Sequence, residues 1–205
     1  MEYFYAAVIH DIKNQLTELA LRLEKRGDAA QEMSIVMHAS RQLTDLLLFQ
    51  RQKEGRMKAN VDSASPTDTL RDLRAEYHEL FPQLTLELDD SAAPAFGFYD
   101  AALVRLALAN AMHNACAHAR SQVRLAVAQQ DGWLTFSIQD DGEGFSSERL
   151  AMEIIEPGTI SERGTGLGLF LAHKIAELHE LDGRSGRVEL ANAECGGGLF
   201  RLRLP

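Results

Sequence analysis

The sequence holds little cysteine, proline or tryptophan, and it lacks a long apolar run. Its 205 residues include two cysteines, five prolines and one tryptophan. Cys116 and Cys195 lie far apart without the spacing of metal ligands, which excludes a disulfide-stapled scaffold and a zinc ribbon. Apolar runs such as residues 4–9 are far shorter than the roughly 18 residues of a membrane helix, and no secretory leader is recognisable. We therefore expect a cytoplasmic chain that makes no membrane contact of its own.

Positive charge is also scarce. The chain has 21 Lys and Arg against 30 Asp and Glu, which gives a net charge of −9. Because binding to nucleic-acid phosphates needs clustered basic residues, this balance argues against a nucleic-acid partner. The deficit is uneven, since residues 1–60 are nearly neutral whereas the remainder is strongly acidic. The uneven charge indicates two units. With 45% hydrophobic and 25% charged residues, the overall composition is that of a folded protein.

The first 60 residues carry two helical patterns. Apolar residues recur at spacings of three and four over residues 5–23 and again over 33–49, as in helices with one buried stripe. Residues 25–28 combine basic residues, a glycine and an aspartate, which suits a turn between helices. We expect an antiparallel helical hairpin over residues 1–58 and a linker over 59–66. Two such helices cannot bury their stripes alone, so we expect a homodimer that forms a four-helix bundle.

After the linker the pattern becomes a mixture of helices and strands. Alternating apolar residues run up to Asp131-Gly132 and away from it, which predicts a β-hairpin. An Ala-rich helix is expected over residues 100–119. Further helices are expected at 67–80 and 165–181, and strands at 84–88, 123–127, 134–138, 188–191 and 199–204. The predicted fold class is α+β, in which the helical hairpin is followed over residues 67–205 by an α/β sandwich with a mixed sheet.

A histidine and two polar residues stand together near the start of the first helix. His10 and Asn14 are one helical turn apart and share a face, and Asp11 is next to His10 in the sequence. A carboxylate that accepts one imidazole N–H raises the reactivity of the other ring nitrogen, so His10 is a candidate nucleophile. The alternative interpretation is a partly buried surface histidine without chemistry.

An acidic residue and two glycines directly follow an expected strand. The carboxylate of Asp140 can accept a hydrogen bond from an exocyclic amine, and Gly142 and Gly144 let the backbone approach a flat ligand closely. The alternative is an ordinary Asp-Gly turn.

Asn110 and Asn114 lie one turn apart on an expected helix. Their side-chain oxygens can coordinate Mg²⁺, whose remaining ligands are phosphate oxygens and several waters. The alternative is that these asparagines form a hydrogen bond between helices.

A second glycine-rich run opens the expected helix near residue 165. Backbone N–H groups at a helix N-terminus favour a phosphate, so the run is a candidate phosphate cradle. It is neither a Walker A loop nor a dinucleotide fingerprint, because the Lys-Ser/Thr pair and the preceding strand are missing. Its residues are Gly164, Gly166, Leu167, Gly168 and Leu169.

In their order along the chain, these four elements resemble the catalytic core of bacterial two-component sensor histidine kinases. Residues 1–58 are similar to the dimerisation and histidine-phosphotransfer hairpin, and residues 67–205 to the ATP-binding domain of the Bergerat type. Residues 196–205 are similar to the last strand of the family. The resemblance implies ATP and Mg²⁺ as cofactors, and transfer of phosphate from ATP to His10 and then to an aspartate of a response-regulator receiver domain.

The resemblance also assigns roles by motif position. It makes Asp11 the activating partner of His10, and it makes Asn14 the residue that orients water when the regulator is dephosphorylated. Asn114 matches the Mg²⁺ ligand, with Asn110 in the same box. The remaining residues match the nucleotide-binding motifs: Asp140 reads adenine, Gly142 and Gly144 shape its pocket, Gly164, Gly166 and Gly168 with Leu167 and Leu169 lie beside the phosphates, and His118 contacts the nucleotide.

Two features depart from the family pattern. His10 lies nine residues from Met1, so either the sequence is part of a longer protein or the signal comes from a separate sensor or upstream partner. Only 19 residues separate Gly144 from Gly164, without a phenylalanine-centred box, which predicts a short lid over ATP and weak nucleotide affinity. The main alternative is a histidine phosphotransferase with a degenerate ATP-binding domain in a phosphorelay. A Bergerat-type ATPase without phosphohistidine chemistry and a dimerisation scaffold are the others.

Overall fold

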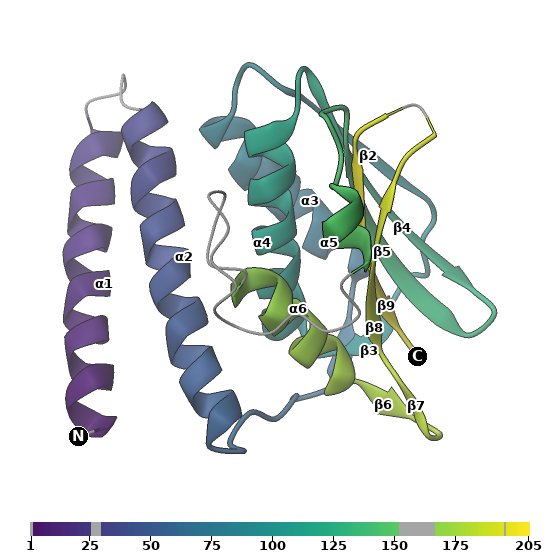
Figure 1. The fold of residues 1–205 in the computed structure, drawn as a ribbon, viewed down its shortest axis with the longest axis horizontal. Helices are drawn as coiled ribbons and strands as arrows, with labels where there is room; N and C mark the ends of the chain where they lie inside the picture. The colour runs from purple at the N-terminus through teal and green to yellow at the C-terminus, as the bar shows by residue number, and fades with distance from the viewer. Residues whose placement is uncertain (1, 26–29, 152–166, 195) are drawn as a thin grey trace. The chain divides into compact units, whose positions relative to one another are not determined.

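The chain forms two compact units, Met1–Met57 and Lys58–Pro205 (Figure 1). The computed structural model describes residues 2–25, 30–151, 167–194 and 196–205. The first unit is the expected helical hairpin, made of α1 (Glu2–Glu24) and α2 (Ala30–Lys53). Its small core is built around two buried residues and their partly buried neighbours, which are Leu23 and Val36 with Leu16, Ala20 and Met33.

Polar and apolar contacts hold the two helices of the hairpin together. The ammonium group of Lys13 on α1 donates a hydrogen bond to Thr44 Oγ1 on α2 at 2.9 Å. Many apolar side chains nevertheless stay exposed on this unit, because two helices offer each other only one side. The exposed ones are Ile12, Leu19, Leu21, Ile35 and Leu46.

The second unit is an α/β sandwich with a mixed five-stranded sheet in the order β2-β4-β5-β9-β8. Strand β2 is parallel to β4, and the other neighbours are antiparallel. The sheet strands are β2 (Thr85–Ala92), β4 (Gln122–Gln130), β5 (Trp133–Asp140), β8 (Arg187–Asn192) and β9 (Gly198–Leu204). One face is covered by α3 (Pro66–Leu80), α4 (Ala101–His118) and α6 (Leu167–Glu177) (Figure 1).

The core lies between these helices and the inner face of the sheet. Along β5 burial alternates, with Leu134, Phe136 and Ile138 buried and their neighbours half-buried, as a strand with one covered face requires. The Asp131-Gly132 turn between β4 and β5 has positive φ at both residues, 51° and 74°, which fits the tight turn of a two-residue hairpin. The expected hairpin is therefore confirmed.

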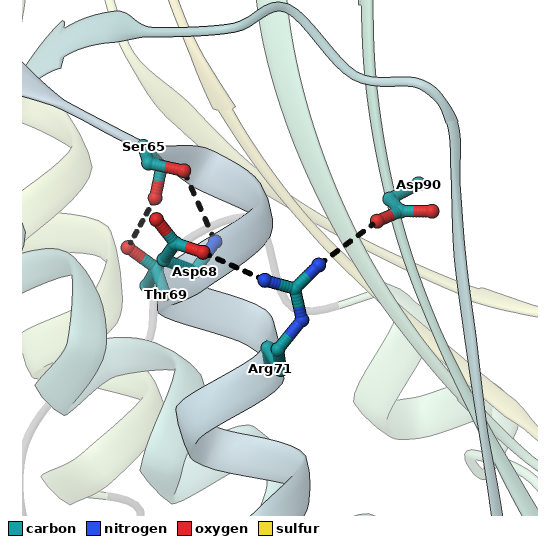
Figure 2. A network of polar contacts seen from close by, with 5 residues as sticks. All are labelled: Ser65, Asp68, Thr69, Arg71 and Asp90. Carbon is teal, nitrogen blue, oxygen red and sulfur yellow. Dashed lines mark hydrogen bonds and ion pairs between the residues drawn. The ribbon is translucent and has the colours of Figure 1, made fainter.

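Caps explain where the helices of the second unit begin. Asp100 caps α4 by accepting a hydrogen bond from Leu103 N–H at 2.9 Å. Ser65 caps α3 in the same way through Asp68 N–H at 3.2 Å, and its carbonyl accepts the Thr69 hydroxyl. Figure 2 shows the guanidinium of Arg71 between Asp68, 2.9 Å away, and Asp90 at the end of β2, 3.9 Å away. The first turn of α3 is thus tied to the edge of the sheet.

Two expectations need correction. The stretch 59–66 is not a plain linker, because β1 (Asp62–Ala64) pairs with β3 (Gly97–Tyr99) and belongs to the second unit. A strand of three residues shows too short an alternation of apolar and polar residues to be predicted from the sequence. The helix expected to reach residue 181 ends at Glu177, since His179 N–H bonds to Ala176 O and closes the last turn. The short elements α5 (Ser147–Ala151), β6 (Glu180–Leu181) and β7 (Arg184–Ser185) were also not expected.

Candidate functional site

The carboxylate of Asp140 is buried at the end of β5. Its Oδ1 accepts two backbone hydrogen bonds, from Gly142 N–H at 2.8 Å and from Gly198 N–H at 3.2 Å. Within the described ranges, no hydrogen bond reaches Oδ2 of the same carboxylate. The backbone therefore fixes the orientation of this side chain through one oxygen and leaves the other as an acceptor for a ligand that carries an amine.

Glycines allow the backbone around Asp140 to pack closely. A methyl group on Gly142 would lie 2.3 Å from the backbone oxygen of His118, at the end of α4. One on Gly197, where φ is +89°, would lie 1.8 Å from the backbone oxygen of Asp140. Both positions therefore exclude any side chain. We call Asp140, Gly142, Gly144, Gly197 and Gly198 the Asp140 cradle.

The turn that follows Asp140 is held by a side chain from another strand. Asn192, the last residue of β8, accepts a hydrogen bond from Phe145 N–H at 2.7 Å and donates one to Phe145 O at 2.9 Å. Gly144 has φ +80°, and a methyl group there would lie 2.6 Å from Asn192 Oδ1. The sequence gives no signal for this role, because an asparagine at a strand end is common and its partner lies 47 residues away.

The expected metal-binding asparagines lie on α4, whose C-terminal end contacts the Asp140 cradle at Gly142. Asn114 and His118 are exposed, and Asn110 is half-buried. The first turn of α6 packs against Asn110, since a methyl group on Gly168 would lie 3.2 Å from Asn110 Cγ. The structure therefore brings Asn110 and Gly168 together, and Leu167 and Leu169 are half-buried beside them in the chain. Gly164 and Gly166 lie outside the described residues.

Asp141 differs sharply from its neighbour Asp140. Its carboxylate accepts hydrogen bonds from Arg120 N–H at 2.8 Å and from the Ser121 hydroxyl at 2.6 Å, and Ser121 N–H adds another. Partial burial raises the pKa of Asp141, but the hydrogen bonds from Ser121 and the neighbouring backbone outweigh it and hold the pKa well below its usual range. Asp141 thus fastens the loop between α4 and β4.

The remaining predicted residues belong to the hairpin unit. His10, Asp11 and Asn14 all lie within α1, and Asp11 and Asn14 are exposed. The side chain of His10 lies outside the described residues. In the ranges that the structure describes, His, Cys, Asp and Glu form no cluster of three or more that could hold a metal ion. No helix in those ranges is both long and apolar enough to cross a membrane.

Comparison with known proteins agrees with this geometry. The model of the family described as histidine kinase-, DNA gyrase B- and HSP90-like ATPase matches residues 99–205. The chain is 38% identical over 101 residues to the sensor protein kinase CarS of Pseudomonas aeruginosa, covering 48% of this chain and 21% of CarS. It is 28% identical over 216 residues to the sensor-type histidine kinase PrrB of Mycobacterium tuberculosis, covering 98% of this chain and 47% of PrrB. The chain thus spans less than half of these relatives.

A solved structure extends the likeness to nearly the whole fold. The crystal structure of full-length ShkA in complex with AMPPNP matches with a TM-score of 0.69 at 20% identity, covering 99% of this chain and 45% of that one. The chain belongs to the histidine kinase-, DNA gyrase B- and HSP90-like ATPase family, and its sequence is similar to the catalytic core of sensor histidine kinases.

Proposed function

We propose that this chain is an ATP-dependent kinase that phosphorylates its own His10 and passes the phosphoryl group to an aspartate of a receiver domain. The observation that carries the proposal is the buried Asp140 carboxylate, which two backbone N–H groups fix through Oδ1 while Oδ2 is left as an acceptor. The AMPPNP named for ShkA supports a nucleotide of the same class here. Because ATP is a cytoplasmic metabolite, we assign this core to the cytoplasm.

In the proposed complex, Asp140 Oδ2 accepts the exocyclic amine of adenine. The Asp140 cradle fits a flat base, because its glycines leave room where side chains would project. Gly168 and its neighbours at the start of α6 face the triphosphate, with Gly164 and Gly166 assigned by motif alone. His118, exposed at the end of α4, is within the same region of the unit and contributes a contact to the nucleotide.

The side chains on α4 also fit a magnesium ion. Asn114 offers an exposed amide oxygen, and Mg²⁺ accepts one or two protein oxygens when phosphate and water complete its shell. Asn110 lies one turn earlier, against Gly168, and helps to line the same face. When bound, Mg²⁺ would neutralise charge on the phosphate oxygens.

His10 supplies the nucleophile. One imidazole nitrogen of His10 forms a bond to the γ-phosphorus while the bond from that phosphorus to the bridging β–γ oxygen breaks, and ADP leaves. Asp11, next to His10 on α1, accepts the other ring N–H and so keeps the attacking nitrogen basic. In the second step a receiver-domain carboxylate takes the phosphoryl group, and the imidazole of His10 leaves unchanged. Asn14, exposed one turn after His10, suits the reverse, hydrolytic step, in which it orients water.

The hairpin supports self-association. Its exposed apolar side chains would be buried if two hairpins formed a four-helix bundle, which is the reason we propose a homodimer.

Incubation of the purified chain with γ-labelled Mg·ATP tests this function. We expect label that is labile in acid and stable in base, and we expect His10→Gln to abolish it. His78→Gln, a change at an exposed histidine of α3, is the matched control and should label normally.

The alternatives give different results in the same assay. Label that reaches His10 only from a phosphorylated receiver domain, and not from ATP, would identify a phosphotransferase. ATP hydrolysis that persists in His10→Gln at the wild-type rate would identify an ATPase without phosphohistidine chemistry. If the chain neither binds nucleotide nor becomes labelled, the remaining interpretation is a dimerisation scaffold.

A further inference from the structure

Three arginines surround the single tryptophan of the chain. The guanidinium carbons of Arg184, Arg187 and Arg203 lie 5.5, 4.6 and 5.2 Å from the ring centroid of Trp133. Such distances are those of cation–π contacts. We call these four residues the Trp133 cluster. Trp133 and Arg203 are half-buried, and Arg184 and Arg187 are exposed.

Trp133, Arg187 and Arg203 alternate with the buried residues of β5, β8 and β9, so their side chains lie on the face of the sheet that α3, α4 and α6 do not cover. Trp133 directly follows the Asp131-Gly132 turn, and Arg184 directly follows a second turn of the same type at Asp182-Gly183. The two hairpin ends lie together, because a methyl group on Gly132 would be 3.5 Å from the guanidinium of Arg184. Arg187 and Arg203 face each other across β8 and β9.

The charges of the cluster are not balanced. Glu189 accepts hydrogen bonds from Arg187 Nε at 2.8 Å and from Arg203 Nη1 at 3.1 Å. Arg184 has no ion pair within the described ranges, so Glu189 is the one carboxylate that pairs with any of the three guanidinium groups there, and Asp131 and Asp182 lie in the adjoining turns without an ion pair to them. Nε of Arg203 is buried, and no hydrogen-bond partner for it is found in those ranges. Like charges gathered on a sheet repel one another, and this happens in a chain whose net charge is −9.

We propose that the Trp133 cluster is a docking surface for an acidic segment of a partner protein. Carboxylates of that segment pair with the exposed guanidinium groups of Arg184 and Arg187 and offset the local excess of positive charge. Trp133 supplies an aromatic anchor of the kind that dominates protein interfaces. A short acidic segment can stay on this small basic area, whereas a long polyanion such as nucleic acid would run over the acidic remainder of the chain.

This surface is separate from the Asp140 cradle. Trp133 and Asp140 are the first and last residues of β5, so they are roughly 23 Å apart at about 3.3 Å per residue. Docking at the Trp133 cluster therefore leaves the cradle open, and the inference does not depend on the proposed function.

Because Trp133 is the only tryptophan, its fluorescence reports on this surface directly. The probe is a hexaglutamate peptide titrated into the full chain at low salt, with hexalysine as the comparison peptide. We expect a saturable fluorescence change with hexaglutamate that weakens as salt is added, and none with hexalysine. Arg184→Glu should raise the dissociation constant at least tenfold without lowering the melting temperature, because this side chain is exposed and has no described ion pair.

Arg71→Glu is the matched control, since it makes the same charge change on α3, over the opposite face of the sheet. The dissociation constant of Arg71→Glu for hexaglutamate should be within about twofold of the wild-type value. Arg184→Glu should bind a labelled ATP analogue with the wild-type affinity. The proposal is overturned if hexaglutamate gives no saturable change, if Arg184→Glu and Arg71→Glu weaken it equally, or if single-stranded DNA or anionic phosphatidylglycerol vesicles bind this cluster more tightly than the peptide. A purely structural cluster would change the melting temperature of Arg184→Glu and show no peptide binding.

Discussion

The adjacent carboxylates of Asp140 and Asp141 have different hydrogen-bond partners and different roles in the fold. Asp140 and Asp141 are chemically identical and consecutive, but Asp140 is the last residue of β5 and Asp141 lies just beyond it. Asp140 points inward to the glycine backbone, and Asp141 points to the end of α4 and binds Arg120 and Ser121. The difference follows from the hydrogen-bond partners of each carboxylate, and we therefore expect substitutions of the two residues to have different effects.

We expect Asp140→Asn to weaken ATP binding about tenfold or more, with a small change in melting temperature. The amide oxygen can still accept from Gly142 and Gly198, but an N–H₂ group then faces the adenine amine, which costs about 1–3 kcal/mol. Isothermal titration calorimetry measures the affinity.

Asp141→Asn is the control for that change. It should lower the melting temperature, because hydrogen bonds to a charged carboxylate are lost, while ATP affinity per folded molecule stays within about twofold. Equal affinity losses in both variants would contradict the assignment of Asp140 to adenine.

At the scale of elements, one buried histidine joins three segments of the second unit. His179 Nε2 accepts Asp100 N–H at 2.9 Å, and its Nδ1 lies 2.7 Å from Ile175 O, so the ring is neutral with the proton on Nδ1. Asp100 caps α4, and its other oxygen accepts Asn60 N–H at 2.8 Å. The end of α6, the start of α4 and the beginning of the second unit therefore meet at His179 and Asp100.

This arrangement predicts how stability depends on pH. Burial lowers the pKa of His179 in the folded chain. An unfolded histidine has a pKa of about 6.5, so below that pH the unfolded chain binds one more proton than the folded chain. The free energy of unfolding should therefore fall as the pH drops from 7.5 to 5.5. We expect the free energy of unfolding to fall more for the wild type than for His179→Gln over this range.

Urea unfolding followed by Trp133 fluorescence measures this difference, because that residue lies in the second unit. His78→Gln, at an exposed position, should keep the wild-type pH dependence. The idea fails if His179→Gln and the wild type lose the same free energy.

At the scale of the whole molecule, the hairpin unit is incomplete by itself. Leu19 is 43% exposed and Ile35 is 69% exposed, although both lie on helices with an apolar stripe. A hairpin that exposes such residues would gain stability by pairing with a copy of itself, as in the proposed homodimer.

We expect Leu19→Glu and Ile35→Glu to shift the chain from dimer to monomer in sedimentation experiments. An unpaired charge buried in the interface costs several kcal/mol, so the dissociation constant should rise at least a hundredfold. Glu18→Gln, next to Leu19 and exposed, should leave the dimer intact. A wild-type chain that sediments as a monomer would contradict the prediction.

Local patterns were enough to place most helices and strands and to single out the motif residues. The spacing of apolar residues located α1, α2 and α4, and the Asp131-Gly132 turn located the hairpin, because these features depend on neighbours within a few residues. Asp140, Gly142 and Asn114 were candidates for the same reason, since their chemistry and spacing can be seen without a partner.

Contacts between distant segments decided the rest. The clamp of Asn192 on Phe145 joins residues 47 positions apart, and the bond between His179 and Asp100 joins residues 79 apart. Strand β1 exists only because β3 pairs with it, and the Trp133 cluster exists only because two hairpin ends and two strands meet on one face. Such contacts leave no periodic pattern in the chain, because each depends on where the fold brings a remote residue.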